Sequence, residues 1–165
     1  MKAVVYNKKG LPDKLIYSDV DKPVPNDNEV LIKVLAVSVN AADYRSIRMG
    51  FIPKRKVFGA DIAGWVESIG KNIRQFKPGD KVIGDLSGCG FGGFAEYAVA
   101  PEKALIPKRA KILFDEAAAL PMAAITTLQA LRDKGNIQKG QQVLIAVSGG
   151  GVEPFLSSLP NISML

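Results

Sequence analysis

Short runs rich in valine and isoleucine, with glycines and prolines spread between them, recur along the first 110 residues. Lys2 to Tyr6 alternates apolar and polar residues, and Ala60 to Ile69 repeats the pattern over a longer stretch. The 16 glycines and ten prolines are spread between such runs, and Pro78-Gly79 has the centre that a type II turn requires. Short strands joined by tight turns favour a small β-barrel over a helical bundle.

The longest of these runs ends where a helix is expected to begin. Glu29 to Asn40 is apolar enough to be buried on both faces of a sheet. Ala41 to Met49 consists of helix formers, and Gly50 after it suits a helix C-terminus. The pattern therefore places Asn40 at a strand-to-helix junction.

The pattern changes after residue 110. Asp115 to Leu120 and Pro121 to Asp133 have helical composition, and Gly135 ends the run. Gln142 to Val147 is a continuous apolar strand that leads into glycines, as at the start of a parallel nucleotide-binding sheet. We therefore expect one domain over 1–110, the beginning of a second over 111–152, and a tail over 153–165 that prolines keep from being helical.

The chain has no histidine and one cysteine, Cys89, which excludes an internal disulfide and leaves almost nothing for a soft-metal site. The formal charge of +6 is dispersed, and the one tight cluster, Lys54-Arg55-Lys56, is more typical of a solvated loop than of a nucleic-acid site. No apolar run is long enough to span a membrane and the start does not resemble a signal peptide, so we expect a cytoplasmic protein without a nucleic-acid partner.

Five segments, taken together, carry a family resemblance. They are Val37 to Tyr44, Gly59 to Gly64, Phe76 to Val82, Gly92 to Tyr97 and Ala117 to Pro121. In this order they resemble the medium-chain dehydrogenase/reductase superfamily, and most of all its zinc-free quinone oxidoreductase and enoyl reductase branch. The resemblance implies a mainly β fold with some α, a GroES-like partly open β-barrel followed by the first helices and strand of an incomplete Rossmann domain.

The resemblance also implies a reaction without a metal. The positions that match zinc ligands of the alcohol dehydrogenase branch hold Asn40, Ala60 and Ala123 here, and alanine offers no ligand atom. The branch transfers hydride from NADPH to a quinone, or to the β-carbon of an enone or enoyl thioester, and its members are often homodimers. The acceptor would then be polarised by hydrogen bonds.

The candidate site residues follow from the same match. Asn40 and Tyr44 match catalytic positions beside the nicotinamide; the alternatives are a helix N-cap for Asn40 and a half-buried helix residue for Tyr44. Thr127 matches a position that touches the nicotinamide amide, or belongs to a helix interior. The residues expected to receive the cofactor pyrophosphate are Ser148, Gly149, Gly150, Gly151 and Val152.

Two aspartates near the junction are expected to be structural or to support the site. Asp43 lies in the expected helix, and Asp61 begins the next strand. For Asp61, an ion pair with Arg45 or Arg48 is the simplest expectation.

The family pattern stops after Val152, where Glu153-Pro154 stands in place of a further glycine. Restoring one base before Glu153 in a back-translation of the tail permits a sequence that resembles the family's helix. A single-base loss in a run of G is therefore our hypothesis for the tail. A gene without a family-like continuation in the neighbouring frame would contradict it.

Two alternatives to a reductase remain open. One is a non-catalytic GroES-like binding module, against which the helical stretch from Asp115 to Asp133 argues. The other is an inactive truncated product that exposes apolar side chains of Ile125, Leu128, Leu131 and Val143 to Val147. The second is compatible with a reductase family, because this chain alone is not expected to be active.

Overall fold

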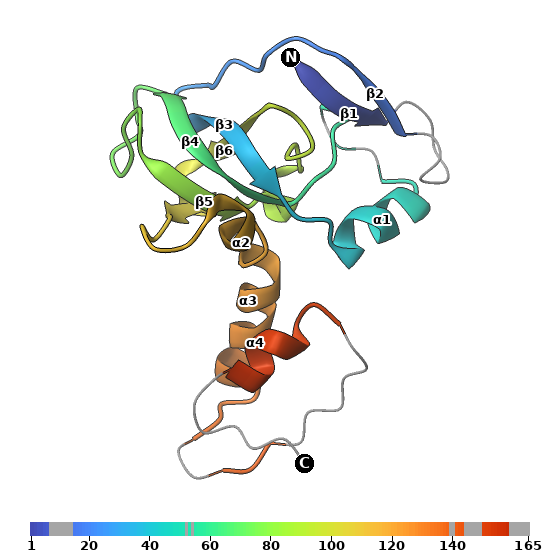
Figure 1. Ribbon diagram of the computed structural model, residues 1–165, viewed down its shortest axis with the longest axis vertical. Helices are drawn as coiled ribbons and strands as arrows, with labels where there is room; N and C mark the ends of the chain where they lie inside the picture. The colour runs from blue at the N-terminus through green and yellow to red at the C-terminus, as the bar shows by residue number, and fades with distance from the viewer. Residues whose placement is uncertain (7–14, 52, 54, 139–140, 144–149, 159–165) are drawn as a thin grey trace. The chain divides into compact units, whose positions relative to one another are not determined.

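The computed structural model describes residues 1–6, 15–51, 53, 55–138, 141–143 and 150–158 (Figure 1). The chain forms two compact units, Met1–Pro121 and Met122–Leu165. The architecture is mainly β with a few helices, as the sequence predicts. No helix in the described part of the chain is long and apolar enough to cross a membrane.

The first unit contains a five-stranded antiparallel sheet and a separate two-stranded hairpin. The order in the sheet is β6-β3-β4-β5-β7, and Figure 1 shows β3, β4 and β5 side by side. The hairpin pairs β1 with β2. The strands are β1 (Lys2–Tyr6), β2 (Leu15–Asp19), β3 (Glu29–Val37), β4 (Asp61–Ile69), β5 (Lys81–Asp85), β6 (Tyr97–Pro101) and β7 (Leu105–Pro107).

The core of this unit lies against one face of the sheet. Val30 and Ile32 of β3 pack with Ile62 and Val66 of β4 and with Val82 of β5. Each of these side chains is at most 2% exposed. Ala63 of β4 and Ile83 of β5 are buried in a second cluster, so the other face of the sheet is covered there as well. This packing holds the strand ends that carry the candidate site.

The prediction that the longest strand is buried on both faces is wrong for its second half. Val30 to Ile32 are buried without a break, but Leu35 is 48% exposed and Val37 is 39% exposed. The register against β4 shifts between Val34 and Ala36. From Lys33 to Val37 exposed and partly buried residues alternate, so only one face of this half of the strand is covered.

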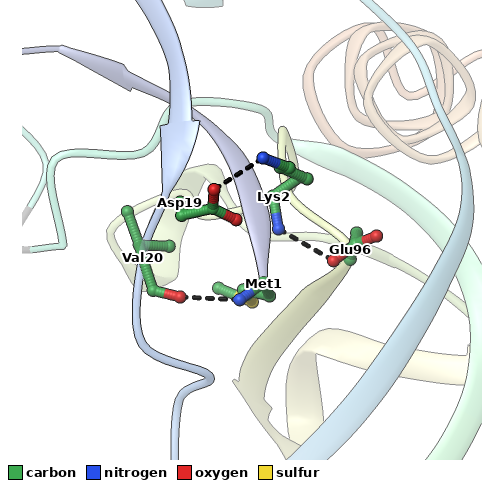
Figure 2. Close-up of polar contacts among 5 residues, drawn as sticks. All are labelled: Met1, Lys2, Asp19, Val20 and Glu96. Atoms are coloured by element: carbon green, nitrogen blue, oxygen red, sulfur yellow. Dashed lines mark hydrogen bonds and ion pairs between the residues drawn. The ribbon is translucent and has the colours of Figure 1, made fainter.

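The hairpin is tied to the segment before β6 (Figure 2). The Lys2 backbone N–H donates to Glu96 Oε2 at 2.8 Å, and the Met1 amino group donates to the Val20 carbonyl at 2.7 Å. Lys2 Nζ also pairs with Asp19 at 2.6 Å. That pair is exposed and adds little stability, so the backbone contacts hold the hairpin in place.

Two turns confirm local predictions from glycine. Gly79 has a φ of 91°, the left-handed value that the third residue of a type II turn needs. Gly50 has a φ of 76° and follows the C-cap Met49, so it ends the first helix as predicted. The helices of the first unit are α1 (Ala41–Arg48) and α2 (Phe114–Ala118).

In the second unit, α3 (Pro121–Leu128) begins at the boundary and continues as a π-helical turn that ends at Gly135. The predicted strand from Gln142 to Val147 falls mostly on residues 144–149, which lie outside the described residues. Ile125 is 43% exposed and Leu128 is 42% exposed, as predicted for these two side chains.

The expectation of a non-helical tail is wrong at its start. A helix, α4 (Glu153–Ser158), follows the glycine turn directly. Pro154 stands in the first turn of this helix, where a backbone N–H has no partner within the helix in any case. A proline interrupts a helix only further along, so it does not prevent one here.

Candidate functional site

The candidate site is built where β3 gives way to α1. Asn40 is the N-cap of α1 and has an extended backbone, with φ −109° and ψ 160°. Its backbone N–H donates to Asp43 Oδ2 at 2.7 Å, which fixes the first turn of the helix. The N-cap role expected for Asn40 is therefore confirmed at the level of the backbone.

The Asn40 side chain is held by two neighbours, Ser38 just after β3 and Asp61 at the start of β4. Its Nδ2 donates to Ser38 Oγ at 3.0 Å and to Asp61 Oδ2 at 3.0 Å. Ser38 Oγ in turn donates to the same Asp61 oxygen at 3.1 Å. These three side chains form a closed triangle, called here the Ser38–Asn40–Asp61 network.

Asp61 is fully buried, with 0% of its surface exposed. The structure gives it two neutral donors, Ser38 and Asn40. The ion pair with Arg45 or Arg48 expected from the sequence stays a prediction. Ser38 was not among the predicted site residues. Its signal in the sequence is its spacing of two from Asn40, which puts both side chains on one side of an extended chain.

Two glycines allow the segment before β4 to lie in contact with the segment before β6. Gly59 has a φ of 96°, and a Cβ there would lie 2.5 Å from the Phe94 nitrogen. The Gly93 N–H donates to the Gly59 carbonyl at 2.9 Å, and the Phe94 N–H donates to the Phe58 carbonyl at 2.8 Å. Only glycine can occupy position 59 at this short distance from Phe94. The contact places Asp61 beside the end of β3.

Asp43 lies in the first turn of α1 and is 1% exposed. Burial raises the pKa of its carboxyl group, and the negative charge of Asp85 adds to the rise. Hydrogen bonds from the backbone of Asn40, Gly59 and Ala60 oppose it. Asp43 therefore connects the helix start to the start of β4.

Tyr44 follows on the same helix, and its side chain is 43% exposed. Residues four apart share a helix face, so Tyr44 and Asn40 lie on one side of α1. Tyr44 is thus partly packed and partly in solvent, as in the half-buried alternative. Its exposed part is accessible to a ligand.

The donor chemistry does not fit a zinc ion. The Asn40 amide nitrogen is bonded to Ser38 and Asp61, and Ala60 is a buried methyl group with no ligand atom. Ala123, in the second unit, is also an alanine with a buried side chain. Among the residues that the structure describes, no group of three His, Cys, Asp or Glu side chains is placed to bind a metal.

The second unit brings together two of the expected cofactor contacts. Thr127 is 2% exposed, and its hydroxyl donates to the Ala123 carbonyl at 2.9 Å and to the Val152 carbonyl at 3.5 Å. This is the arrangement of a helix-interior threonine. Gly150 and Gly151 are exposed and lead through Val152 into α4.

These residues fit a dinucleotide in part. An exposed glycine turn that runs into a helix is typical of a pyrophosphate site. Here, however, Pro154 in the first turn of α4 has no N–H to donate, and Glu153 adds a carboxylate. The Thr127 hydroxyl, in contrast, is already used within the protein. Ser148 and Gly149 lie outside the described residues.

The comparisons with known proteins agree with this geometry. Residues 26–110 match the model of the alcohol dehydrogenase GroES-like domain family. The chain belongs to this family. Within the medium-chain dehydrogenase/reductase superfamily, it stands in the quinone oxidoreductase branch.

Three similar proteins illustrate the match. A chloroplast envelope quinone oxidoreductase homolog of Arabidopsis thaliana is 35% identical over 175 residues, which cover 99% of this chain and 53% of that protein. The solved quinone oxidoreductase of Coxiella burnetii has a TM-score of 0.79 at 34% identity, over 87% of this chain and 48% of its own. A mycobacterial protein solved with NADPH has a TM-score of 0.82 at 27% identity, over 94% and 48%. The chain thus spans about half the length of these GroES-like relatives.

Proposed function

We propose that this protein is an NADPH-dependent, zinc-independent oxidoreductase that reduces a quinone or an activated C=C bond. NADPH supplies the hydride when it is bound. The observation that carries the proposal is the Ser38–Asn40–Asp61 network, which fills a position of the zinc-dependent branch with a hydrogen-bonded amide. A site built in this way acts on its acceptor through hydrogen bonds in place of a Lewis acid.

In this proposal, Tyr44 and Asn40 have different tasks. The Tyr44 hydroxyl donates a hydrogen bond to the oxygen of the acceptor, where negative charge develops as hydride arrives. Asn40 orients a ligand beside it. Gly150, Gly151 and Val152, with Ser148 and Gly149, receive the pyrophosphate.

Oxidation of NADPH, followed by the loss of its absorbance, tests the proposal. We expect turnover of a benzoquinone or an α,β-unsaturated ketone by the protein extended to the length of its relatives, with and without a zinc chelator. If the chelator abolished turnover and added zinc restored it, the result would contradict a zinc-independent mechanism. Tyr44→Phe should lower kcat, with roughly a tenfold or larger effect for one hydrogen bond to a developing charge.

For residues 1–165 alone we propose that turnover is absent. Fluorescence titration of NADPH against the purified chain tests this directly, because binding precedes any reduction. Saturable, tight binding with turnover would show that the chain is an enzyme by itself.

A further inference from the structure

The Ser38–Asn40–Asp61 network leaves the Asn40 amide only one orientation. The Asn40 nitrogen, and not its oxygen, lies 3.0 Å from Asp61 Oδ2 and donates to it. A carboxylate oxygen accepts such a hydrogen bond.

Ser38 completes the network with its single proton. Its hydroxyl donates to Asp61 at 3.1 Å, so it can only accept from Asn40 at 3.0 Å. Both neighbours therefore lie on the nitrogen side of the Asn40 amide. The other polar atom of the amide is its carbonyl oxygen.

We infer that Ser38 and Asp61 are positioning residues that make Asn40 a hydrogen-bond acceptor toward the ligand. The ligand group that meets Asn40 must then carry an N–H or an O–H, as a carboxamide does. A quinone or enone carbonyl has only acceptor atoms and cannot bond to it. This inference rests on the proposed function, and it leaves the Tyr44 hydroxyl as the donor for the acceptor oxygen.

The orientation also resists reversal. Turning the amide would place its oxygen against the Asp61 carboxylate and leave two acceptors facing each other in a site where Asp61 is 0% exposed. Two buried acceptor atoms that face each other repel, and one hydrogen bond is lost, so this orientation is costly. The pairing of β3 with β4 holds the two strands in place, with the Ser38 N–H 3.4 Å from the Asp61 carbonyl.

Hydrogen exchange of the Asn40 side-chain protons, measured by NMR on the ¹⁵N-labelled chain of 165 residues, tests the network. We expect both protons to exchange slowly, and roughly tenfold faster in Ser38→Ala and in Asp61→Asn, since each change weakens one hydrogen bond of the Asn40 amide. Ser18→Ala is the matched control, because β2 pairs only with β1 in the described sheets. Fast exchange in the unaltered chain would overturn the inference. If Asp61→Asn does not fold, Ser38→Ala alone decides.

Two small molecules, added to the same labelled protein, test whether Asn40 accepts a hydrogen bond from its ligand. Nicotinamide has N–H donors, whereas 3-acetylpyridine has the same ring and carbonyl without them. We expect nicotinamide to shift the ¹³Cγ resonance of Asn40 and 3-acetylpyridine to leave it in place. Equal shifts with both probes, or no shift with either, would overturn the acceptor role. Slow exchange in this chain, together with no NADPH-dependent turnover by the protein extended to the length of its relatives, would contradict only the proposed function.

Discussion

Gly64 is the residue whose substitution should most directly connect the fold to the site. It lies in β4 opposite Val34, next to the bulge of β3. A Cβ at Gly64 would lie 2.2 Å from the Lys33 carbonyl oxygen and 2.9 Å from Ile32 Cγ2. The carbonyl belongs to the backbone, so β3 itself has to move by about 1 Å before the contact is an ordinary one.

The cost of Gly64→Ala can be estimated from this contact. Inserting a methyl group into a packed region costs about 1–3 kcal/mol, and we expect the upper part of the range because no side-chain rotation relieves the clash. Gly79→Ala is the matched control. No atom lies within 4 Å of a Cβ at Gly79, although its φ is 91°. Its cost should therefore be only about 1 kcal/mol, for a left-handed backbone.

Urea unfolding, followed by the fluorescence of the single tryptophan Trp65 and by circular dichroism, measures both variants. Gly64→Ala should also speed the exchange of the Asn40 side-chain protons, since β3 carries Ser38 toward Asp61. Gly79→Ala should not. A Gly64→Ala variant as stable as Gly79→Ala, with unchanged exchange, would refute the reasoning from the bulge.

Three further predictions concern single side chains. Phe58 is 0% exposed and packs edge-to-face on Tyr6 at a centroid distance of 5.6 Å, so Phe58→Ala should lower the unfolding free energy by about 3–5 kcal/mol. Phe51→Ala, at a ring 47% exposed, should cost only about 1 kcal/mol in the same urea titration. Because the pKa of Asp43 is raised in the folded state, its contribution to stability is present in acid and is lost as the pH rises through that pKa. Relative to wild type, Asp43→Asn should therefore gain stability from acid toward neutral pH, and a difference independent of pH would contradict this. Burial also raises the pKa of Cys89, so its alkylation by iodoacetamide should reach half its maximal rate at a higher pH than for a free thiol; a lower midpoint would contradict the packing around it.

Much of the fold follows from local patterns. The Pro78-Gly79 turn and the helix end at Gly50 depend on backbone preferences of a few neighbouring residues, so both could be predicted from the sequence. Strand positions were predicted to within a few residues for the same reason; for example, the run predicted from Ala60 is β4, which begins at Asp61. The prediction of a non-helical tail is wrong at residues 153–158, because the first turn of a helix tolerates a proline.

The sequence by itself determined which atoms are available at the junction. Asn40 brings an amide, Tyr44 a hydroxyl and Ala60 only a methyl group, and no folding can change this composition. The tertiary structure decided which of these groups meet. The contact of Asp61 with Ser38 and Asn40 depends on the register of β4 against β3, and the bulge after Val34 sets that register. Such pairing joins residues more than 20 positions apart, so it arises from packing across strands and not from any local pattern.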